Sequence, residues 1–469
     1  MKTRTEVDPL GQREVPENAY YGIQTLRASE NFPVSGLKAP ISFIKAYVHI
    51  KAAAAKANTR LKILDTERGN AIISACDEVL HGRLLDQFIV DVFQAGAGTS
   101  FNMNVNEVLA NRALEMLGKK KGTYHEMSPN DHVNMSQSSN DTFPTALHIS
   151  VLTSLRSLLT ELDRLAQSFD KLARKNRDTI KTGRTHLQDA LPVTIGDEFK
   201  AYAVALRKCR EQLENRSDLL LEIALGGTAV GTGAGGHPQF RTLAIAELNK
   251  TTGLRLKPAG DSFEALQSRR ALSAVSSALR ELSLELTRIA NDLRLLSSGP
   301  TAGLAEISLR PVQPGSSIMP GKFNPVMAEC LNMIAYQIIG NDLATSLAVQ
   351  AGQLELNVMT PVIMHNILQS IELLTNYLPQ FRERCVDGIR VDKKRCNGYL
   401  SRNPSLAQFL SAKIGYLEAS KIAKQALDEG RSVKDIAVEK GILSASDADR
   451  IFSRDNLLGR KTERLGSWT

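Results

Sequence analysis

The chain has 469 residues, of which 42% are hydrophobic, 23% charged and 5% aromatic, so collagen-like, low-complexity and wholly disordered classes are excluded. Fifty-eight Lys and Arg against fifty Asp and Glu leave a formal charge of +8. This charge suits a small anionic substrate, although plain solubility also accounts for it. The basic residues form short groups without interleaved aromatic residues, which argues against a nucleic-acid partner.

No segment at the start of the chain has the apolar core of a signal peptide, and none later approaches the roughly 20 apolar residues of a membrane span. We therefore expect no membrane partner and a cytoplasmic location. The cysteines form neither a CxxC pair nor a Cys/His zinc spacing, so we expect reduced thiols and no metal site. They are Cys76, Cys209, Cys330, Cys385 and Cys396.

In chain order, the first part of the sequence has weak helical periodicity and is interrupted by Pro9, Pro16, Pro33 and Pro40. We assign residues 1–138 to an N-terminal, mostly helical domain. Residues 139–395 carry much longer helical patterns, which we assign to a central bundle domain. Residues 396–469 form a small C-terminal helical domain, with helices expected at 414–429 and 433–440.

Two apolar seams define the central domain. The first consists of Leu152, Leu155, Leu159, Leu162, Leu165, Phe169 and Leu172. The second advances in alternating steps of three and four residues, a heptad pattern that predicts one long helix. Its members are Leu272, Val275, Leu279, Leu282, Leu286, Ile289, Leu293 and Leu296.

Two further long helices are expected at about 196–225 and 325–347, and the pattern of the latter leaves open a continuation toward residue 378. Helices of this length favour an all-α, three-domain long helical bundle. The chemistry must then lie at helix ends and in the loops between helices.

Two glycine-rich segments resemble phosphate-binding loops but fail the detailed pattern. Gly231, Gly233 and Gly236 fit G-x-G-x-x-G, yet the residues before them predict a helix end rather than a strand. In GSSIMPGKFNP the glycines are one residue too far apart, and Phe323 stands where a magnesium-binding hydroxyl is needed.

The second segment still carries useful chemistry. Ser316 and Ser317 lie beside glycine, and Lys322 and Asn324 precede a long helix. A flexible loop with exposed N–H groups and one ammonium group can bind an anion. Residues 315–325 are therefore either an anion-binding loop with a candidate catalytic serine, or a flexible linker.

Three other segments are rich in hydroxyl and amide side chains. They contain Thr99, Ser100, Asn102, Asn104 and Asn106; Ser136, Gln137, Ser138, Ser139, Asn140 and Thr142; and Arg184, Thr185, His186, Gln188 and Asp189. Any one of them is explained by helix capping. All four segments together, each expected to open a long helix, instead favour one polar pocket at helix ends. His186 stands out among the histidines as a candidate for proton relay or substrate binding, because its segment is polar.

These segments together resemble the aspartase/fumarase superfamily, whose signature loop GSSxMPxKxNP is matched from Gly315 to Pro325. The likeness covers nearly the whole chain. It includes AYYGIQTLRASENFP, GAGTSFNMNVNEV, SPNDHVNMSQS, NDLRLLSSGP and QLELNVMTPVI. The closest branch is that of the aspartate ammonia-lyases.

Class II fumarate hydratases are the nearest competing branch. Ser128 replaces the histidine that opens their HPND motif, and the GAGTSFN segment differs from their GSGTQTN. Ser138-Ser139-Asn140, in contrast, has the hydratase form, since aspartases usually have Ser-Thr-Asn. Further departures from the family pattern include Thr301 in place of an arginine and Phe323 in place of a valine.

The resemblance implies elimination of ammonia from L-aspartate to give fumarate, with Ser316 as the general base. Lys322, Asn324 and Ser317 would stabilise the enediolate, while His186 and Thr185 would bind a carboxylate and Glu329 would orient His186. The remaining substrate contacts would come from Thr99, Ser138, Ser139 and Asn140.

The resemblance also implies a homotetramer in which each site is built from three subunits and uses no cofactor. The resemblance leaves activation by a divalent cation open. Two alternatives stay open: fumarate hydratase activity on malate, and a catalytically silent homologue that binds a dicarboxylate.

Overall fold

The computed structural model describes residues 2–460, and helices account for most of that range. The strands of these residues form two-stranded ribbons only. The predicted all-α class is therefore confirmed. Among residues 2–460, no helix is both long and apolar enough to cross a membrane.

The chain divides into two compact units, each built from three separate stretches. Unit 1 comprises Met1–Thr160, Cys209–Leu284 and Ile334–Asn376. Unit 2 comprises Glu161–Lys208, Glu285–Met333 and Tyr377–Thr469. This division is spatial and does not test the predicted boundaries near residues 138 and 395, which stay a prediction.

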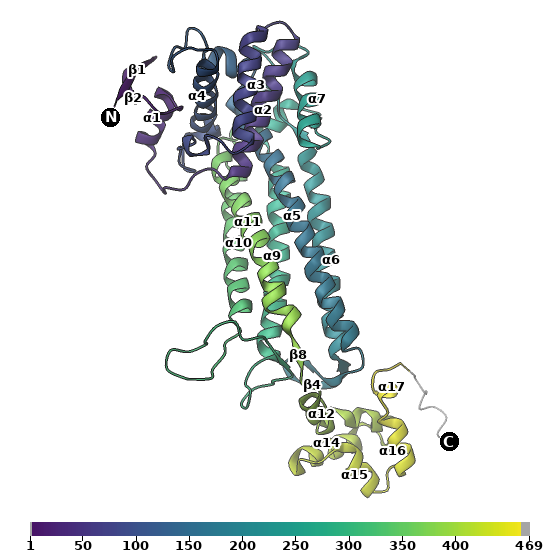
Figure 1. Cartoon of the computed structure of the whole chain (residues 1–469). Coiled ribbons are helices and arrows are strands. Elements are labelled where there is room, and N and C mark those ends of the chain that lie inside the picture. Colours follow the sequence, from purple (N-terminus) through teal and green to yellow (C-terminus); the bar gives the residue numbers. More distant parts are fainter. Residues whose placement is uncertain (1, 461–469) are drawn as a thin grey trace. The chain divides into compact units, whose positions relative to one another are not determined.

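Long helices with residues in both units make up the central part of the chain (Figure 1). They are α5 (Ser139–Lys175), α6 (Ile195–Ser217), α9 (Arg270–Leu296), α10 (Val326–Gln350) and α11 (Thr360–Arg384). The heptad prediction is confirmed in α9, because every seam residue from Leu272 to Leu296 is at most 6% exposed.

One predicted helix end is wrong. The helix expected at 196–225 ends at Ser217, whose Oγ–H donates to Glu214 O at 2.7 Å, and a 3-10 turn (η4, Asp218–Leu221) follows. Such local side-chain bonds compete with helix propagation. The helix expected at 325–347 is confirmed by α10, and its pattern had left a continuation toward residue 378 open. The structure excludes that continuation, because α10 ends at Gln350, where Asn357 Nδ2 donates to the carbonyls of Ala348 and Val349 at 3.0 Å each.

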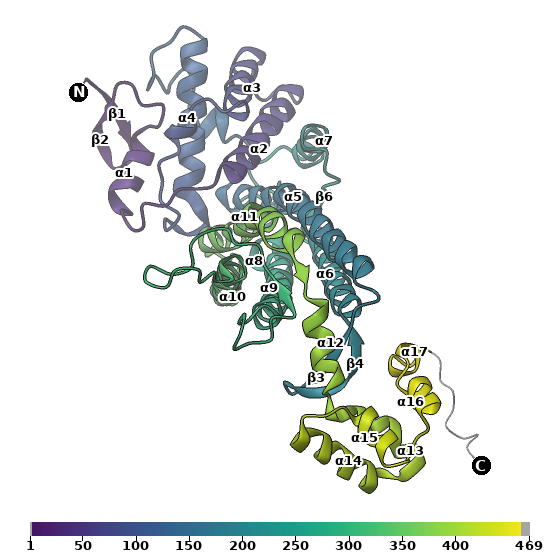
Figure 2. The ribbon, with the colours of Figure 1, turned by 60° about the horizontal axis from the view of Figure 1, so that its bottom comes forward.

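Unit 1 contains the N-terminal elements and α7 (Phe240–Thr252). The others are β1 (Thr3–Asp8), β2 (Gly11–Pro16), α1 (Ile23–Asn31), α2 (Ile41–Arg60), α3 (Thr66–Leu80), α4 (Thr99–Met116) and α8 (Ser262–Gln267), with the short parallel pair β5 (Glu222–Ile223) and β6 (Lys257–Pro258). Helix α2 packs against both α3 and α7 (Figure 2), and the buried alanines at 52–55 permit this close approach.

An aromatic cluster forms part of the core of unit 1. Phe43 and Tyr47 of α2 meet Phe101 of α4 and Phe143 of α5, with ring centroids 4.8–6.4 Å apart. All four side chains are at most 1% exposed. Edge-to-face and tilted ring contacts of this kind stabilise a core beyond their area, so the first turns of α4 and α5 are fixed relative to each other.

Unit 2 contains the antiparallel hairpin of β3 (Ile180–Thr185) and β4 (Gln188–Thr194), which lies beside α12 (Lys393–Ser401) (Figure 2). β7 (Ile307–Ser308) pairs with β8 (Arg390–Val391). The last helices are η6 (Pro404–Leu410), α13 (Ser411–Ile414), α14 (Tyr416–Glu429), α15 (Val433–Glu439), α16 (Ala445–Ile451) and α17 (Arg454–Leu457). The predicted helices at 414–429 and 433–440 thus lie within two residues of α14 and α15.

Candidate functional site

Thr99 begins α4 and Ser139 begins α5, and their hydroxyl oxygens lie 3.0 Å apart. The residue before Thr99 must be glycine. Gly98 has φ +70°, and a Cβ there would overlap the ring of Phe143. The missing side chain therefore allows the start of α4 to approach α5 closely.

Ser138 and Asn140 flank Ser139 in the same turn. Ser138 Oγ accepts a hydrogen bond from Asn140 N at 3.2 Å, and Asn140 Nδ2 donates to Ala229 O at 2.8 Å. The structure thus brings four of the candidate residues together in unit 1. We call Thr99, Ser138, Ser139 and Asn140 the Thr99–Asn140 cluster.

A buried lysine supports the segment that leads into this cluster. Lys51 of α2 is 0% exposed, and its Nζ donates to Asn102 Oδ1 at 2.8 Å and to Asn134 Oδ1 and Gln137 Oε1 at 3.0 Å each. Burial lowers the pKa of Lys51 to about 7, and the negative charge of Asp141 opposes that shift. The three amide oxygens satisfy the ammonium group and fix the chain just before Ser138.

The three asparagines of the GAGTSFNMNVNE segment do not cap a helix, so capping does not explain this segment. Asn102, Asn104 and Asn106 lie inside α4 and are at most 3% exposed. Asn104 Oδ1 accepts from Ile89 N and its Nδ2 donates to Gln87 O, both at 3.0 Å. These side chains hold neighbouring loops in place.

Thr185 and His186 lie in a β-hairpin, so the expectation that their segment opens a long helix is wrong. The hairpin loop consists of His186 and Leu187, with φ values of +56° and +60°. Two successive left-handed residues define a type I′ turn, which matches the twist of the flanking strands but usually contains Asn and Gly. Residue types that are typical of helix caps therefore form a strained hairpin turn here.

An ion network anchors this hairpin within unit 2. The Glu306 carboxylate is 0% exposed and receives both guanidinium nitrogens of Arg184 at 3.0 Å and Lys181 Nζ at 2.7 Å. Lys181 also pairs with Glu198 at 2.9 Å. Burial raises the pKa of Glu198, whereas the charge of Lys181 lowers it. Arg184 is two residues from His186, so this network fixes the strand that ends in the turn.

The segment Gly315–Pro325, here called the Ser316 loop, leads into α10 in unit 2. Ser316 Oγ accepts hydrogen bonds from Ile318 N at 3.3 Å and from Met319 N at 3.0 Å. Asn324 Nδ2 donates to Gly315 O at 2.6 Å, which closes the loop at its base. Two N–H donors directed at one hydroxyl oxygen favour its anionic form.

Lys322 is exposed, and its Nζ donates to the neutral amide oxygen of Asn324 at 2.9 Å. Within residues 2–460 its ammonium group forms no salt bridge, so its positive charge is available to an anion. Ser317 is exposed beside it. Glu329 lies in the first turn of α10, and within the described chain no hydrogen bond joins it to His186.

The candidate residues therefore form three groups. The Thr99–Asn140 cluster belongs to unit 1, whereas the hairpin turn and the Ser316 loop belong to unit 2. Within residues 2–460, no hydrogen bond or salt bridge links the hairpin turn to the Ser316 loop.

Three functional supports escaped the sequence analysis: Lys51, Asp141 and Glu306. A single lysine in the alanine-rich run HIKAAAAKAN is the signal that could have indicated Lys51. Asp141 directly follows the Ser-Ser-Asn motif, yet its acceptor role depends on residues more than eighty positions away.

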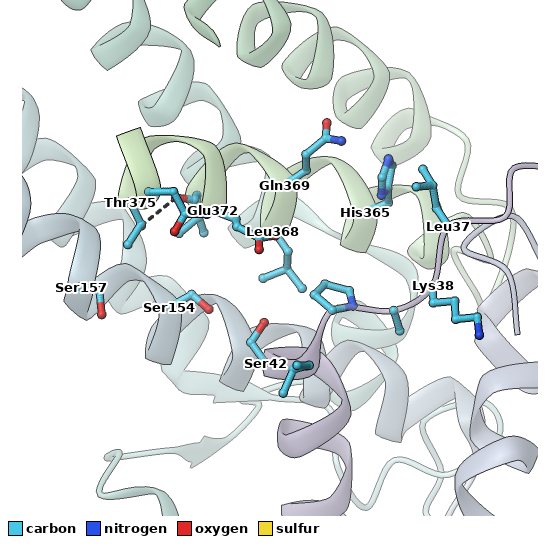
Figure 3. A pocket seen from close by; sticks show the side chains of 15 residues that line it. Leu37, Lys38, Ser42, Ser154, Ser157, His365, Leu368, Gln369, Glu372 and Thr375 are labelled. Atoms are coloured by element: carbon cyan, nitrogen blue, oxygen red, sulfur yellow. Dashed lines mark hydrogen bonds between the residues drawn. The ribbon is translucent and has the colours of Figure 1, made fainter. Parts of the chain in front are cut away.

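Unit 1 also contains a cavity of about 570 Å³, lined mainly by residues 37–42 and by α5 and α11 (Figure 3). None of the candidate residues lines it. Its polar side chains include Ser42, Ser154 and Glu372. In the described range, no group of three or more His, Cys, Asp or Glu side chains is arranged to hold a metal ion.

The sequence model of a lyase family matches residues 11–340, and that of the fumarase C C-terminus matches residues 406–459. Aspartate ammonia-lyase from Bacillus subtilis is 47% identical over 450 residues, covering 96% of this chain and 95% of that protein. Aspartate ammonia-lyase from Escherichia coli is 45% identical over 458 residues, covering 97% and 96%.

Solved structures give the same assignment. The fumarate lyase:delta crystallin of Brucella melitensis bound to cobalt is 47% identical, with a TM-score of 0.93 over 97% of this chain and 99% of that chain. The class II fumarase of Schistosoma mansoni is 36% identical, with a TM-score of 0.92 over 96% and 98%. The chain therefore belongs to the lyase family, within the aspartase/fumarase superfamily that its motifs indicated.

Proposed function

We propose that this protein is an aspartate ammonia-lyase, a carbon–nitrogen lyase that converts L-aspartate reversibly to fumarate and ammonia. Relatives with that name are 45–47% identical over at least 96% of the chain, whereas the class II fumarase is 36% identical. The observation that carries the proposal is the Thr99–Ser139 contact beside Asn140, because hydroxyl and amide groups there can bind both the amine and a carboxylate.

Ser316 acts as the general base. Its hydroxyl proton is first lost to solvent. The resulting alkoxide takes the proton from C3 of aspartate, and the electron pair moves into the adjacent carboxylate to give an enediolate. Collapse of the enediolate forms the C2–C3 double bond and expels the amino group. The amine is already protonated and leaves as ammonia, so the step needs no strong general acid.

The enediolate carries two negative charges, and preorganised donors must meet this charge as it develops. The ammonium group of Lys322, which forms no salt bridge within residues 2–460, and the amide of Asn324 have the required chemistry, with the Ser317 hydroxyl and the loop N–H groups beside them. The two N–H groups that already donate to Ser316 Oγ support its role as base, since they reduce the cost of its deprotonation.

The remaining candidate residues bind substrate. Thr99, Ser138, Ser139 and Asn140 contact the amine and carboxylates, while Thr185 and His186 bind a carboxylate from the opposite side and Glu329 orients His186. The reaction uses groups of the protein alone and no cofactor, and we expect the protein to act in the cytoplasm.

We further propose a homotetramer in which three subunits complete each site. Support comes from α10, whose residues Tyr336, Leu343 and Leu347 are 55%, 63% and 54% exposed in the single chain. Apolar side chains repeated along one helix and left uncovered are typical of an oligomer interface. Sedimentation velocity tests this, and a monomer would contradict it.

Separate assays with L-aspartate and L-malate, following fumarate by its ultraviolet absorbance, test the function. Turnover of aspartate alone is the expected result. Turnover of malate alone would indicate fumarate hydratase, an alternative that the Ser138-Ser139-Asn140 motif favours. If neither substrate reacts while fumarate still binds, the protein is a silent dicarboxylate-binding homologue.

A further inference from the structure

Asp141 follows Asn140 directly, and its carboxylate is 0% exposed. The two carboxylate oxygens have different partners. Oδ1 accepts from Ser138 N at 3.0 Å, whereas Oδ2 accepts from Gly226 N at 3.0 Å and Thr228 N at 2.9 Å. One side chain therefore joins the turn of the Thr99–Asn140 cluster to a distant segment of unit 1.

That segment is the start of the glycine-rich stretch that fits no nucleotide-binding pattern. Gly226 has φ +89° and Thr228 has φ +54°, so both residues adopt left-handed backbone conformations. This conformation directs the N–H groups of Gly226 and Thr228 at one carboxylate oxygen, and Asn140 Nδ2 adds a second link at Ala229 O. Backbone strain outside glycine persists only where surrounding contacts hold it, and here the carboxylate supplies them.

Lys51 supports the other end of the same turn through Asn134 and Gln137. Its ammonium group also offsets the buried negative charge of Asp141 without touching it. Burial raises the pKa of Asp141 to about 6, against the backbone hydrogen bonds and the charge of Lys51, which lower it. The turn is thus held between two buried, opposite charges.

We propose that Asp141 is a positioning residue: its carboxylate fixes Ser138, Ser139 and Asn140 in the geometry that binds the substrate. This inference rests on the proposed function of those three residues. Three N–H donors converge on the carboxylate. An amide in its place has one acceptor oxygen and one NH2 group, so at least one donor would face another donor.

The test compares Asp141→Asn with Glu107→Gln in the full-length protein. Glu107 is a matched control because it is 1% exposed, lies in the same unit and accepts hydrogen bonds from Gly22 N, Gln24 N and Thr25 N. Those partners begin α1 and contain no candidate site residue. Both variants replace one buried carboxyl group by an amide.

We expect Asp141→Asn to raise KM at least tenfold while kcat changes less than threefold, since the base lies on another segment. Both variants should lower the melting temperature by a similar amount, and Glu107→Gln should leave KM unchanged. Equal KM values in Asp141→Asn and wild type would overturn the proposal and leave Asp141 a purely structural residue.

If Asp141→Asn does not fold, Gly226→Ala provides the same test from the loop side. A Cβ at Gly226 would lie 2.7 Å from Arg241 Cβ and would shift the two donors without changing any charge. The same rise in KM is expected, and an unchanged KM would overturn the proposal. Wild-type turnover tests the function separately. If malate is the substrate, its KM serves the comparison, and if nothing reacts, the Kd of fumarate by calorimetry does.

Discussion

The Thr99–Asn140 cluster and the Ser316 loop carry similar side chains in very different surroundings. The cluster lies on a buried aromatic core and is braced by Lys51 and Asp141, both fully buried. The Ser316 loop makes its polar side-chain contacts with itself, and Ile318 and Phe323 are 83% and 58% exposed. One part of the candidate site is preorganised by packing, while the other is held by a few local bonds.

This difference separates two kinds of mutational effect. Changing the loop removes chemistry from a segment on which little of the fold depends, whereas changing the cluster disturbs a packed region with many partners. Substitutions in the loop should therefore alter catalysis alone. Substitutions beneath the cluster should alter stability and substrate binding together.

Ser316→Ala gives the largest expected effect. Removal of the base should lower kcat by about 10⁴-fold, at the upper end of general-base contributions. The melting temperature should stay within about 1 °C, because Ser316 Oγ accepts only from Ile318 N and Met319 N of its own loop. Steady-state fumarate formation and thermal unfolding measure the two quantities. An alanine variant that keeps a tenth of wild-type turnover would exclude Ser316 as the base.

Lys322→Ala should lower kcat/KM by about 10³-fold, since the lost ammonium group stabilises both the bound carboxylate and the enediolate. Lys424→Ala is the matched control, because Lys424 is also an exposed lysine of unit 2 but lies on α14. It should leave kcat/KM unchanged. Equal losses in the two variants would point to the overall charge of the protein rather than to Lys322.

Gly98→Ala tests the packed region. We expect the free energy of unfolding to fall by roughly 3 kcal/mol, because alanine must adopt a left-handed backbone there and because its Cβ would overlap Phe143. KM should rise because Thr99 is the next residue.

Gly118→Ala is the control that separates the two costs, since Gly118 has φ +71° with no atom within 4 Å of its Cβ position. Gly118→Ala should lower the free energy of unfolding by about 1 kcal/mol. If chemical denaturation gives the same loss of unfolding free energy for Gly98→Ala and Gly118→Ala, overlap with Phe143 is not a cause of the loss.

Local pattern was enough to predict much of this molecule. The heptad of α9 is fully buried because a repeat of three and four residues fits only one face of a helix. The Thr99 and Ser139 segments do open long helices. The cluster of Thr99, Ser138, Ser139 and Asn140 was likewise expected from composition and resemblance.

The sequence analysis was wrong, undecided or silent about features that residues outside the local pattern determine. Asn357 caps the carbonyls that end α10, and nothing in the apolar pattern of 325–347 reveals this. The polar segment at His186 looked like a helix cap because capping and turn residues have the same composition. Lys51 and Asp141 act through partners far along the chain, so their roles follow from the fold and not from local spacing.

The smallest effect is expected at the exposed hairpin turn, which shares its solvent exposure with the Ser316 loop but stores backbone strain. Leu187 is 70% exposed with φ +60°, at a turn position that favours glycine. Leu187→Gly should therefore stabilise the protein by about 1 kcal/mol, measured by chemical denaturation.

Leu10→Gly is the matched control, because Leu10 is 79% exposed in the β1–β2 hairpin and lacks a positive φ. Glycine there only increases the freedom of the unfolded chain and should lower the free energy of unfolding by about 0.5 kcal/mol. If both variants lost stability, the His186 turn would carry no strain, and its conformation would reflect the twist of the hairpin alone.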